Sequence, residues 1–436
     1  MKGNFQLIIL IVFIVLAVFG VLVFSGAIQI GSSSNSTGAQ GTVVLWGTAP
    51  TQAIASALDT FNRTNTSFVV KYSQQDPETF DQDLLEALAS GQGPDMFLLP
   101  DNLALHYANK IYKIPYQSYT QATFKNTFAS AGEVFLTSGG ILAFPIGIDP
   151  LMMYYNRSIL DANSVVYPPT YWDDFQALVP VLNQKNSTNN QITQSAVALG
   201  QFSNISNAKN IIATLFMQTG NSIVAEKNGA FVSALSDANG GKTSNLSSIL
   251  SFYTNFADPS KGSYSWNKSL PNSQDFFSSD NLAFYFGYAS ELPILINKNP
   301  NLDFSVAPLP QLKNSGSKLT SARVTGIAVA ASSRNLNTAI TAASLLATSD
   351  FASKFSNALI IPPARRDLLA AKPTDSFFPI FYASALFSKS WLDPSTNDTD
   401  NIFRVMVENI LSNNLSADNS VIDAGGKLSL LLTRYQ

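Results

Sequence analysis

Short apolar strands alternate with amphipathic helices between residues 42 and 100, and this alternation limits the possible folds more than any other feature. "TVVLW" is a β-branched run, and "PTQAIASALDTFNRT" after it places Ile54, Leu58 and Phe61 on one helical face. The strand "SFVVKYSQQ", the helix "DPETFDQDLLEALASG" and the strand "PDMFLLP" follow. Strands that alternate with helices favour a parallel sheet covered by helices on both faces. The pattern therefore predicts an α/β protein.

The N-terminus carries an apolar run over residues 7–24, preceded by one positive charge at Lys2. About twenty apolar residues span a bilayer as a helix, whereas the apolar core of a signal peptide usually has roughly 7–15. We expect residues 1–28 to form a retained transmembrane anchor, with a cleaved signal peptide as the alternative. Lys2 then places the N-terminus in the cytoplasm and the rest of the chain outside the membrane. Residues 29–41, which contain "GSSSNSTGAQG", are expected to be a flexible tether.

Length and composition exclude several classes of protein. A chain of 436 residues is too long for one ordinary core, so two lobes or domains are expected. It contains no cysteine, which excludes disulfides and thiolate metal sites, and around its one histidine, His106, no Ser-His-Asp hydrolase pair or HExxH zinc motif stands out. The net charge is −3 with scattered lysine and arginine, so nucleic acid is not an expected partner. We expect no cofactor and no metal.

The stretch "GGILAFPIGIDPLMMYYNRSIL", residues 139–160, resembles a buried strand with a single acid, Asp149, in its middle. An unpaired buried charge costs several kcal/mol, so a simple core strand does not explain this carboxylate. Pro150 restrains Asp149 to extended geometry. We interpret the stretch as a crossing between two lobes, with Asp149 at a join that admits water.

Several stretches carry a resemblance to a known family. They are "LLEALASGQGPDMFLL", the crossing followed by "PPTYWDDF", "LAFYFGYASELPIL" with "FSVAPLPQL", and "VTGIAVAASSRNLNTAITAASLLA". Their order and spacing resemble those of the extracellular solute-binding proteins of ABC importers, specifically the class that contains maltose-binding protein. The resemblance covers nearly the whole chain after the tether.

The resemblance implies a type II periplasmic-binding-protein-like fold. It has two α/β lobes, each a mostly parallel sheet flanked by helices, joined by crossing strands near residues 147–149, 307–310 and 360–363. The first lobe is then expected to contain residues 42–148 and 309–359, and the second lobe residues 149–308 and 360–436. It also implies a monomer that is not an enzyme, works outside the membrane, captures a small solute between its lobes and delivers it to ABC permease subunits.

Residues at the ends of strands are the first candidates for ligand binding. Trp46 ends the first strand, at the sheet edge where ligands bind in open α/β folds, although a core position is the alternative. Asp101 and Asn102 follow the "PDMFLLP" strand at the same edge, and a helix N-cap is their alternative role. The resemblance implies a polar ligand contact at Asp149, and a hinge residue that bonds neighbouring backbone amides is its alternative role.

Later candidates depend more on the resemblance. Tyr154 and Tyr155 point to opposite faces of a strand, so at most one faces the cleft, and Tyr154 is our candidate. The family often supplies an aromatic side chain at a strand-to-helix turn, which here is Tyr288. Trp391 offers another stacking face, and Arg365 follows the third crossing, where it bridges lobes or bonds ligand.

The chain also departs from the sugar-binding pattern. Leu99 stands where maltose-binding protein has a stacking tryptophan, and Ser290 stands at the commonest tryptophan position of the later turn. A sugar or oligosaccharide remains the leading ligand class, with peptide-like, polyol or other polar solutes open. A sensory ectodomain and an anchored glycoside hydrolase are the alternative functions, the second weakened because no acid pairs with Asp149 in the sequence.

Overall fold

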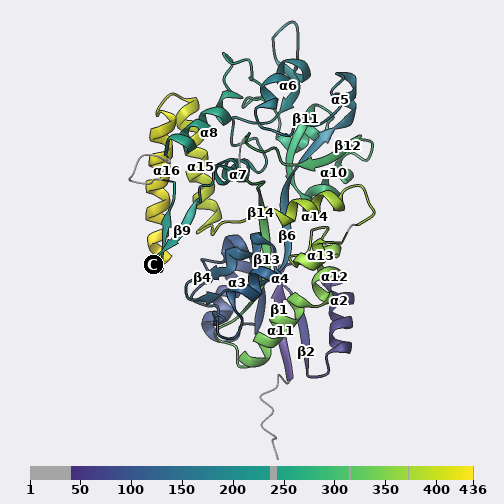
Figure 1. Cartoon of the computed structure of the whole chain (residues 1–436), viewed down its shortest axis with the longest axis vertical. Coiled ribbons are helices and arrows are strands. Elements are labelled where there is room, and N and C mark those ends of the chain that lie inside the picture. The colour runs from purple at the N-terminus through teal and green to yellow at the C-terminus, as the bar shows by residue number, and fades with distance from the viewer. Residues whose placement is uncertain (1–40, 236–242, 314–315, 372, 436) are drawn as a thin grey trace, which may run out of the picture. The chain divides into compact units, whose positions relative to one another are not determined.

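The computed structural model describes residues 41–235, 243–313, 316–371 and 373–435, within one compact unit, Gln40–Gln436 (Figure 1). The expected anchor and nearly all of the expected tether lie outside the described residues. Within those residues, no helix combines the length and apolarity needed to cross a membrane.

The first lobe is built on a sheet with the strand order β2-β1-β3-β13-β6. β1 pairs in parallel with β2 and β3, as the alternating pattern predicts, whereas β13 runs antiparallel to both β3 and β6. β13 therefore lies between two strands that precede it by more than 160 residues of chain. The bounds are β1 Gly41–Gly47, β2 Phe68–Gln74, β3 Met96–Pro100, β6 Ala143–Asn156 and β13 Thr320–Val329.

Helices cover this sheet with the apolar faces that the sequence predicts. In α2 (Thr51–Thr64) the buried residues are Ile54, Ala57, Leu58 and Phe61, one stripe at helical spacing. α12 packs on α2, and α11 contacts β1, β6 and β13. The remaining elements of this lobe are α3 Phe80–Ser90, η1 Asp101–Leu103, α4 Gln121–Thr127, η2 Ser130–Phe135, β4 Leu136–Thr137, β5 Gly140–Ile141, α11 Leu336–Thr348, α12 Asp350–Ala358 and α13 Arg366–Leu369.

The strand β6 joins the two lobes as one continuous element. Its first part, up to Pro150, pairs with β13, and its second part, from Leu151, pairs with β11 and β12. Figure 1 shows β6 passing from the first sheet into the second. The crossing predicted around Asp149 thus falls where β6 changes partners.

The second lobe is built on β6, β11, β8 and β7, in that order, with β12 on the other side of β6. β11 runs parallel to β8 and antiparallel to β6. The bounds of its strands are β7 Gln184–Lys185, β8 Ile192–Val197, β9 Val224–Lys227, β10 Ala230–Ser233, β11 Leu282–Tyr288 and β12 Phe304–Pro308, and β14 Ser388–Lys389 pairs with β13.

Its core combines aromatic and aliphatic side chains from the sheet and the surrounding helices, among them Trp172, Phe216, Tyr285 and Phe403. The helix α16 packs on α15 and α8, so the C-terminal part of the chain covers this lobe. The helices are α5 Arg157–Ala162, α6 Asp174–Leu182, α7 Ala208–Gln218, α8 Thr243–Asn255, α9 Ser273–Ser278, η3 Ala289–Glu291, α10 Leu292–Lys298, α14 Phe378–Leu386, α15 Thr396–Leu411, α16 Ala417–Leu432 and η4 Thr433–Tyr435.

Two local predictions are wrong. The pattern "NTAITAASLLATSDFASKFSNAL" predicts one long helix, but Ser349 is extended and separates α11 from α12. Its hydroxyl accepts a hydrogen bond from the Phe351 amide and so caps the second helix. The pattern around His106 predicts a helix, yet residues 104–110 form turns.

Candidate ligand-binding cleft

A cavity of about 770 Å³ lies between the two lobes, and we call it the cleft. The first lobe contributes Asp101, Asn102 and Gly147, and the second contributes the loop and first turn of α7 at residues 202–210. β13 lines it with residues 321–325, and residues 390–404 complete the wall. This volume falls within the range of about 300–1,000 Å³ that is typical of small-molecule sites.

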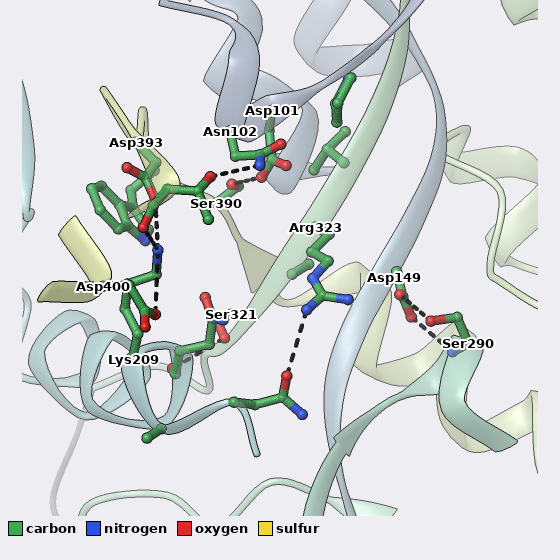
Figure 2. A pocket seen from close by; sticks show the side chains of 18 of the residues that line it. Asp101, Asn102, Asp149, Lys209, Ser290, Ser321, Arg323, Ser390, Asp393 and Asp400 are labelled. Carbon is green, nitrogen blue, oxygen red and sulfur yellow. Dashed lines mark hydrogen bonds and ion pairs between the residues drawn. The ribbon is translucent and has the colours of Figure 1, made fainter. Parts of the chain in front are cut away.

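Asp149 lines the cleft from the point where β6 changes lobes. One carboxylate oxygen accepts a hydrogen bond from the Ser290 amide at 3.0 Å, and the other accepts from the Ser290 hydroxyl at 2.6 Å (Figure 2). Asp149 is only 8% exposed, so the expectation of a water-exposed carboxylate at this join is wrong. Burial raises the pKa of Asp149 to about 6, although the bonds from Ser290 and the charge of Arg323 act in the opposite direction.

The Asp149 carboxyl predicts a specific pH dependence of stability. Its pKa of about 6 in the folded protein exceeds the ordinary value of 3.8, so the folded state retains a proton that the unfolded state releases. Its contribution therefore falls as pH rises from about 4 to about 6, by at most roughly 3 kcal/mol. Urea unfolding across this range should show that the stability of the parent relative to Asp149→Asn falls as pH rises. An unchanged profile, matching that of the exposed control Asp161→Asn, would contradict the assignment.

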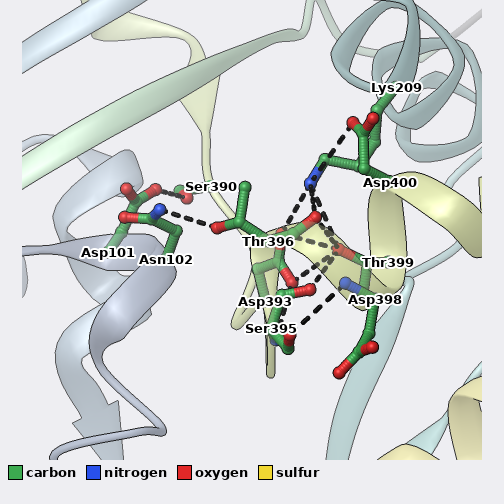
Figure 3. Close-up of polar contacts among 10 residues, drawn as sticks. All are labelled: Asp101, Asn102, Lys209, Ser390, Asp393, Ser395, Thr396, Asp398, Thr399 and Asp400. Carbon is green, nitrogen blue, oxygen red and sulfur yellow. Dashed lines mark hydrogen bonds and ion pairs between the residues drawn. The ribbon is translucent and has the colours of Figure 1, made fainter. Parts of the chain in front are cut away.

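Asp101 and Asn102 begin η1 directly after β3 and contact the C-terminal part of the chain. Asp101 accepts a hydrogen bond from the Ser390 hydroxyl, and the Asn102 amide donates to the Thr396 hydroxyl at 2.8 Å. Asp101 is 6% exposed, and burial raises its pKa to about 6. Figure 3 shows these two contacts side by side. Residues adjacent in the sequence thus connect the first lobe to residues 390–396.

Arg323 is a cleft residue that the sequence interpretation missed. It projects from β13, exposed to the cleft, and its guanidinium lies 3.7 Å from the centre of the Tyr288 ring. A single long hydrogen bond, 3.5 Å, joins it to the Asn207 side chain, which is held in turn by Glu291 at 2.8 Å. The available signal was a lone charge within the apolar strand "SARVTGIAVA".

Lys209 is the second missed residue, and it is buried at the start of α7. Its ammonium donates to Asp393 at 3.0 Å, to the Thr396 carbonyl at 3.1 Å and to the Thr399 hydroxyl at 3.1 Å (Figure 3). Asp400 lies 3.9 Å away. The three donors of the ammonium are therefore used within the protein, and they hold residues 393–399 against α7.

The structure brings four of the candidate residues to the cleft: Asp101, Asn102, Asp149 and Trp391. Trp391 is partly buried and stacks on Phe403 with 6.4 Å between ring centres. The two positions that depart from the sugar-binding pattern differ in their surroundings. Ser290 lines the cleft, whereas Leu99 is fully buried.

The other four candidates lie outside the cleft lining. Tyr154 is fully buried and its hydroxyl donates to the Tyr288 carbonyl at 2.9 Å. Tyr288 is 1% exposed and lies beneath Arg323. Trp46 is partly buried near the end of β1, and Arg365 bonds to the Thr348 carbonyl and to Asp367.

The described parts of the chain contain no group of three acidic or histidine side chains placed to hold a metal ion. The cleft offers hydrogen-bond donors, hydrogen-bond acceptors and an aromatic face, which suit non-covalent recognition of a polar solute.

The chain matches the family described as bacterial extracellular solute-binding protein over residues 47–352. This match covers most of the sequence, and the protein belongs to this family. It is a family of binding proteins, in agreement with the resemblance noted in the sequence. No curated protein sequence matches the chain.

Similar solved structures support the same fold. A cyclo/maltodextrin-binding protein complexed with maltotetraose has a TM-score of 0.72 and 14% identity, over 92% of this chain and 98% of that one. The sugar-binding protein MalE from Xanthomonas citri has a TM-score of 0.68 and 16% identity, over 90% and 98% of the two chains. A cyclic α-maltosyl-1,6-maltose binding protein from Arthrobacter globiformis has a TM-score of 0.71 and 14% identity, over 90% and 99%. The two-lobed type II fold is thereby confirmed.

Proposed function

We propose that this protein captures a saccharide in the cleft and delivers it to the permease of an ABC importer, while residues 1–28 hold it at the outer face of the membrane. The observation that carries the proposal is a cleft lined from both lobes by polar groups and by the indole of Trp391. Carboxylates accept hydrogen bonds from sugar hydroxyls, and amides both donate to them and accept from them. An aromatic face covers the apolar C–H surface of the sugar ring. The similar structures whose names include a bound or recognised sugar support this ligand class.

Binding is proposed to be coupled to closure of the lobes. Hydrogen bonds from residues 101–102 to residues 390–396 and from Ser138 to Glu226 join the lobes. A ligand between the lobes contacts both of them only in the closed state. It therefore binds the closed state more tightly than the open one and shifts the equilibrium towards closure. The closed, loaded protein is then the form that the permease recognises, and no covalent step is required.

The direct test is a thermal-shift screen of the full chain in detergent against neutral oligosaccharides, monosaccharides, polyols, amino acids and short peptides. A ligand at 100 times its Kd stabilises a protein by about 2.7 kcal/mol, so a true ligand should raise the midpoint clearly. Calorimetry should then give a saturable isotherm without turnover of the ligand. If peptides shift the midpoint and no sugar does, the saccharide assignment is wrong, although a solute-binding role survives.

Delivery and anchoring need separate measurements. Cells that produce the full chain should accumulate the labelled ligand, whereas cells that produce residues 40–436 secreted without the N-terminal segment should bind it but accumulate less. The full chain should sediment with membranes after alkaline washing. Release by this washing would contradict a retained anchor.

Replacing Trp391 by alanine should weaken binding of the saccharide found in the screen by about tenfold or more, because a large aromatic contact surface is lost. The midpoint of unfolding without ligand should change only slightly, since Trp391 is only partly buried. Tyr167→Ala provides a control, because that ring is 80% exposed and lies outside the cleft. Equal affinities in the parent and in Trp391→Ala would remove this residue from the site.

A further inference from the structure

Three charged side chains form a row across neighbouring strands at the cleft. Asp101 follows β3, Arg323 belongs to β13 and Asp149 belongs to β6, and these strands are adjacent in the order β3-β13-β6. Arg323 and Asp149 are direct partners in the register of β13 and β6. Figure 2 shows Arg323 between the two carboxylates, and all three residues line the cleft.

The row is electrostatically coupled, but its members do not pair directly. Each carboxylate accepts a hydrogen bond from a serine hydroxyl, Asp101 from Ser390 and Asp149 from Ser290. Across the described chain, Arg323 forms no ion pair, and its one side-chain hydrogen bond is long. Much of the guanidinium edge is thus available to a ligand, which it reaches with donors in a fixed plane.

Negative charge exceeds positive charge around Arg323. The charged or titratable groups that act on it are Tyr288, Asp149, Glu291 and Asp101. The other charges of the cleft form ion pairs of their own, since Lys209 lies between the carboxylates of Asp393 and Asp400, and Arg404 pairs with Glu408. One cation, Arg323, therefore lies among three carboxylates, so a further anion placed on it would meet net repulsion.

We propose that the row Asp101–Arg323–Asp149 selects the ligand by charge, so that the cleft accepts neutral polyhydroxylated sugars and rejects sugars that carry a carboxylate. The inference rests on the proposed function and specifies its substrate class. Neutral hydroxyls donate to the carboxylates and accept from Arg323, which satisfies both kinds of group without adding charge. The carboxylate of a uronic acid gains one contact with Arg323 and faces two like charges.

The selection depends on pH in a defined direction. Burial raises the pKa of Asp101 and of Asp149 to about 6, so both become largely neutral at pH 5. The row then changes from an excess of negative charge to the single positive charge of Arg323. Rejection of uronates, which remain ionised at pH 5, is therefore expected to weaken as pH falls from 7.5 to 5.

The test compares matched sugars on the full chain in detergent by calorimetry. The probes are maltotriose, mannotriose and the best neutral saccharide of the screen, each with its C6-oxidised uronate counterpart. At pH 7.5 and low salt the neutral sugar is expected to bind at least about tenfold more tightly than its counterpart. This difference in affinity between the neutral sugar and its uronate, called the gap below, should narrow at pH 5 and also in Asp149→Asn at pH 7.5.

Variants of Arg323 separate its charge from its geometry. Arg323→Gln should weaken the binding of the neutral sugar and widen the gap between it and the uronate. The reason is that the carboxylates of Asp101 and Asp149 then have no positive charge between them. Arg323→Lys should keep the gap but bind both sugars less tightly, since the planar fork is lost. Arg334→Met, an exposed residue outside the cleft, controls for net charge, and midpoints without ligand control for folding.

Uronates that bind as tightly as neutral sugars at pH 7.5, or a gap that shrinks in Arg323→Gln, would overturn charge selection while leaving saccharide capture intact. Binding of no sugar of either kind would overturn the proposed function and the selection with it.

Discussion

Replacing Lys209 by methionine is expected to lower the free energy of unfolding by about 3–5 kcal/mol. Lys209 is 6% exposed, and its ammonium lies 3.0 Å from Asp393, which is itself 5% exposed. Methionine fills a similar volume but leaves the Asp393 carboxylate buried without an opposite charge nearby. Breaking one side of a buried ion pair costs far more than the pair contributes, because the remaining charge is not solvated.

Urea unfolding of the parent and of Lys209→Met measures this effect. Lys427→Met is the matched control, since Lys427 pairs with Asp423 at 2.7 Å on an exposed face of α16 and should cost less than about 1 kcal/mol. The double variant Lys209→Met with Asp393→Leu should recover most of the lost stability, because it removes both charges. If Lys209→Met costs no more than the control, the pair does not organise the lobe.

The same substitution should weaken ligand binding in proportion to the disorder it produces near the cleft. Lys209 holds the Thr396 carbonyl at 3.1 Å, and the Thr396 hydroxyl receives the hydrogen bond from Asn102. Lys209 is therefore a positioning residue for the wall that carries Trp391.

Replacing Gly200 by alanine is expected to destabilise the protein by about 3 kcal/mol or more. Gly200 has a φ of +92°, where side chains are strained, and an added Cβ would lie 2.5 Å from the backbone nitrogen of Ala257. Backbone atoms cannot move aside as the end of a flexible side chain does, so the strand end or the facing loop must shift. Gly200 directly precedes the loop that brings Phe202 and Asn207 to the cleft.

Gly262→Ala is the control for this prediction, because a Cβ at that position has no atom within 4 Å and the backbone needs no positive φ. Thermal unfolding of the two variants should separate them by many degrees, and a screened ligand should bind the Gly200 variant more weakly at temperatures where it remains folded. Equal midpoints for the two variants would show that the loop adapts without cost.

The framework of the fold was predictable because it depends on local patterns. β1, α2, β2, α3 and β3 appear where apolar periodicity places them, and the crossing at Asp149 appears in β6. The break at Ser349 was not predictable from periodicity, because both flanking helices keep the same apolar spacing and the hydroxyl that caps α12 is a weak signal.

The cleft was predictable in its position and only partly in its residues. Asp101, Asn102 and Asp149 follow strand ends, a feature visible in the sequence, and they line the cavity. Arg323 and Lys209 were missed because a lone cation in an apolar segment does not show which distant carboxylates will surround it. Tyr288 illustrates the converse, since the sequence places an aromatic ring at the correct turn but does not show that Arg323 covers it.

The position of β13 sets an order for folding during synthesis. β13 separates β3 from β6, so both strands leave the ribosome long before their shared neighbour, Thr320–Val329, has been made. Until then each presents an edge of unpaired amides and carbonyls, which invites pairing with other chains. The first lobe is therefore completed only late in translation or after it, while sheet contacts of the second lobe among β6, β11 and β12 form earlier. This delay suits the proposed location of the protein outside the membrane, because an incompletely folded first lobe remains able to pass through the membrane.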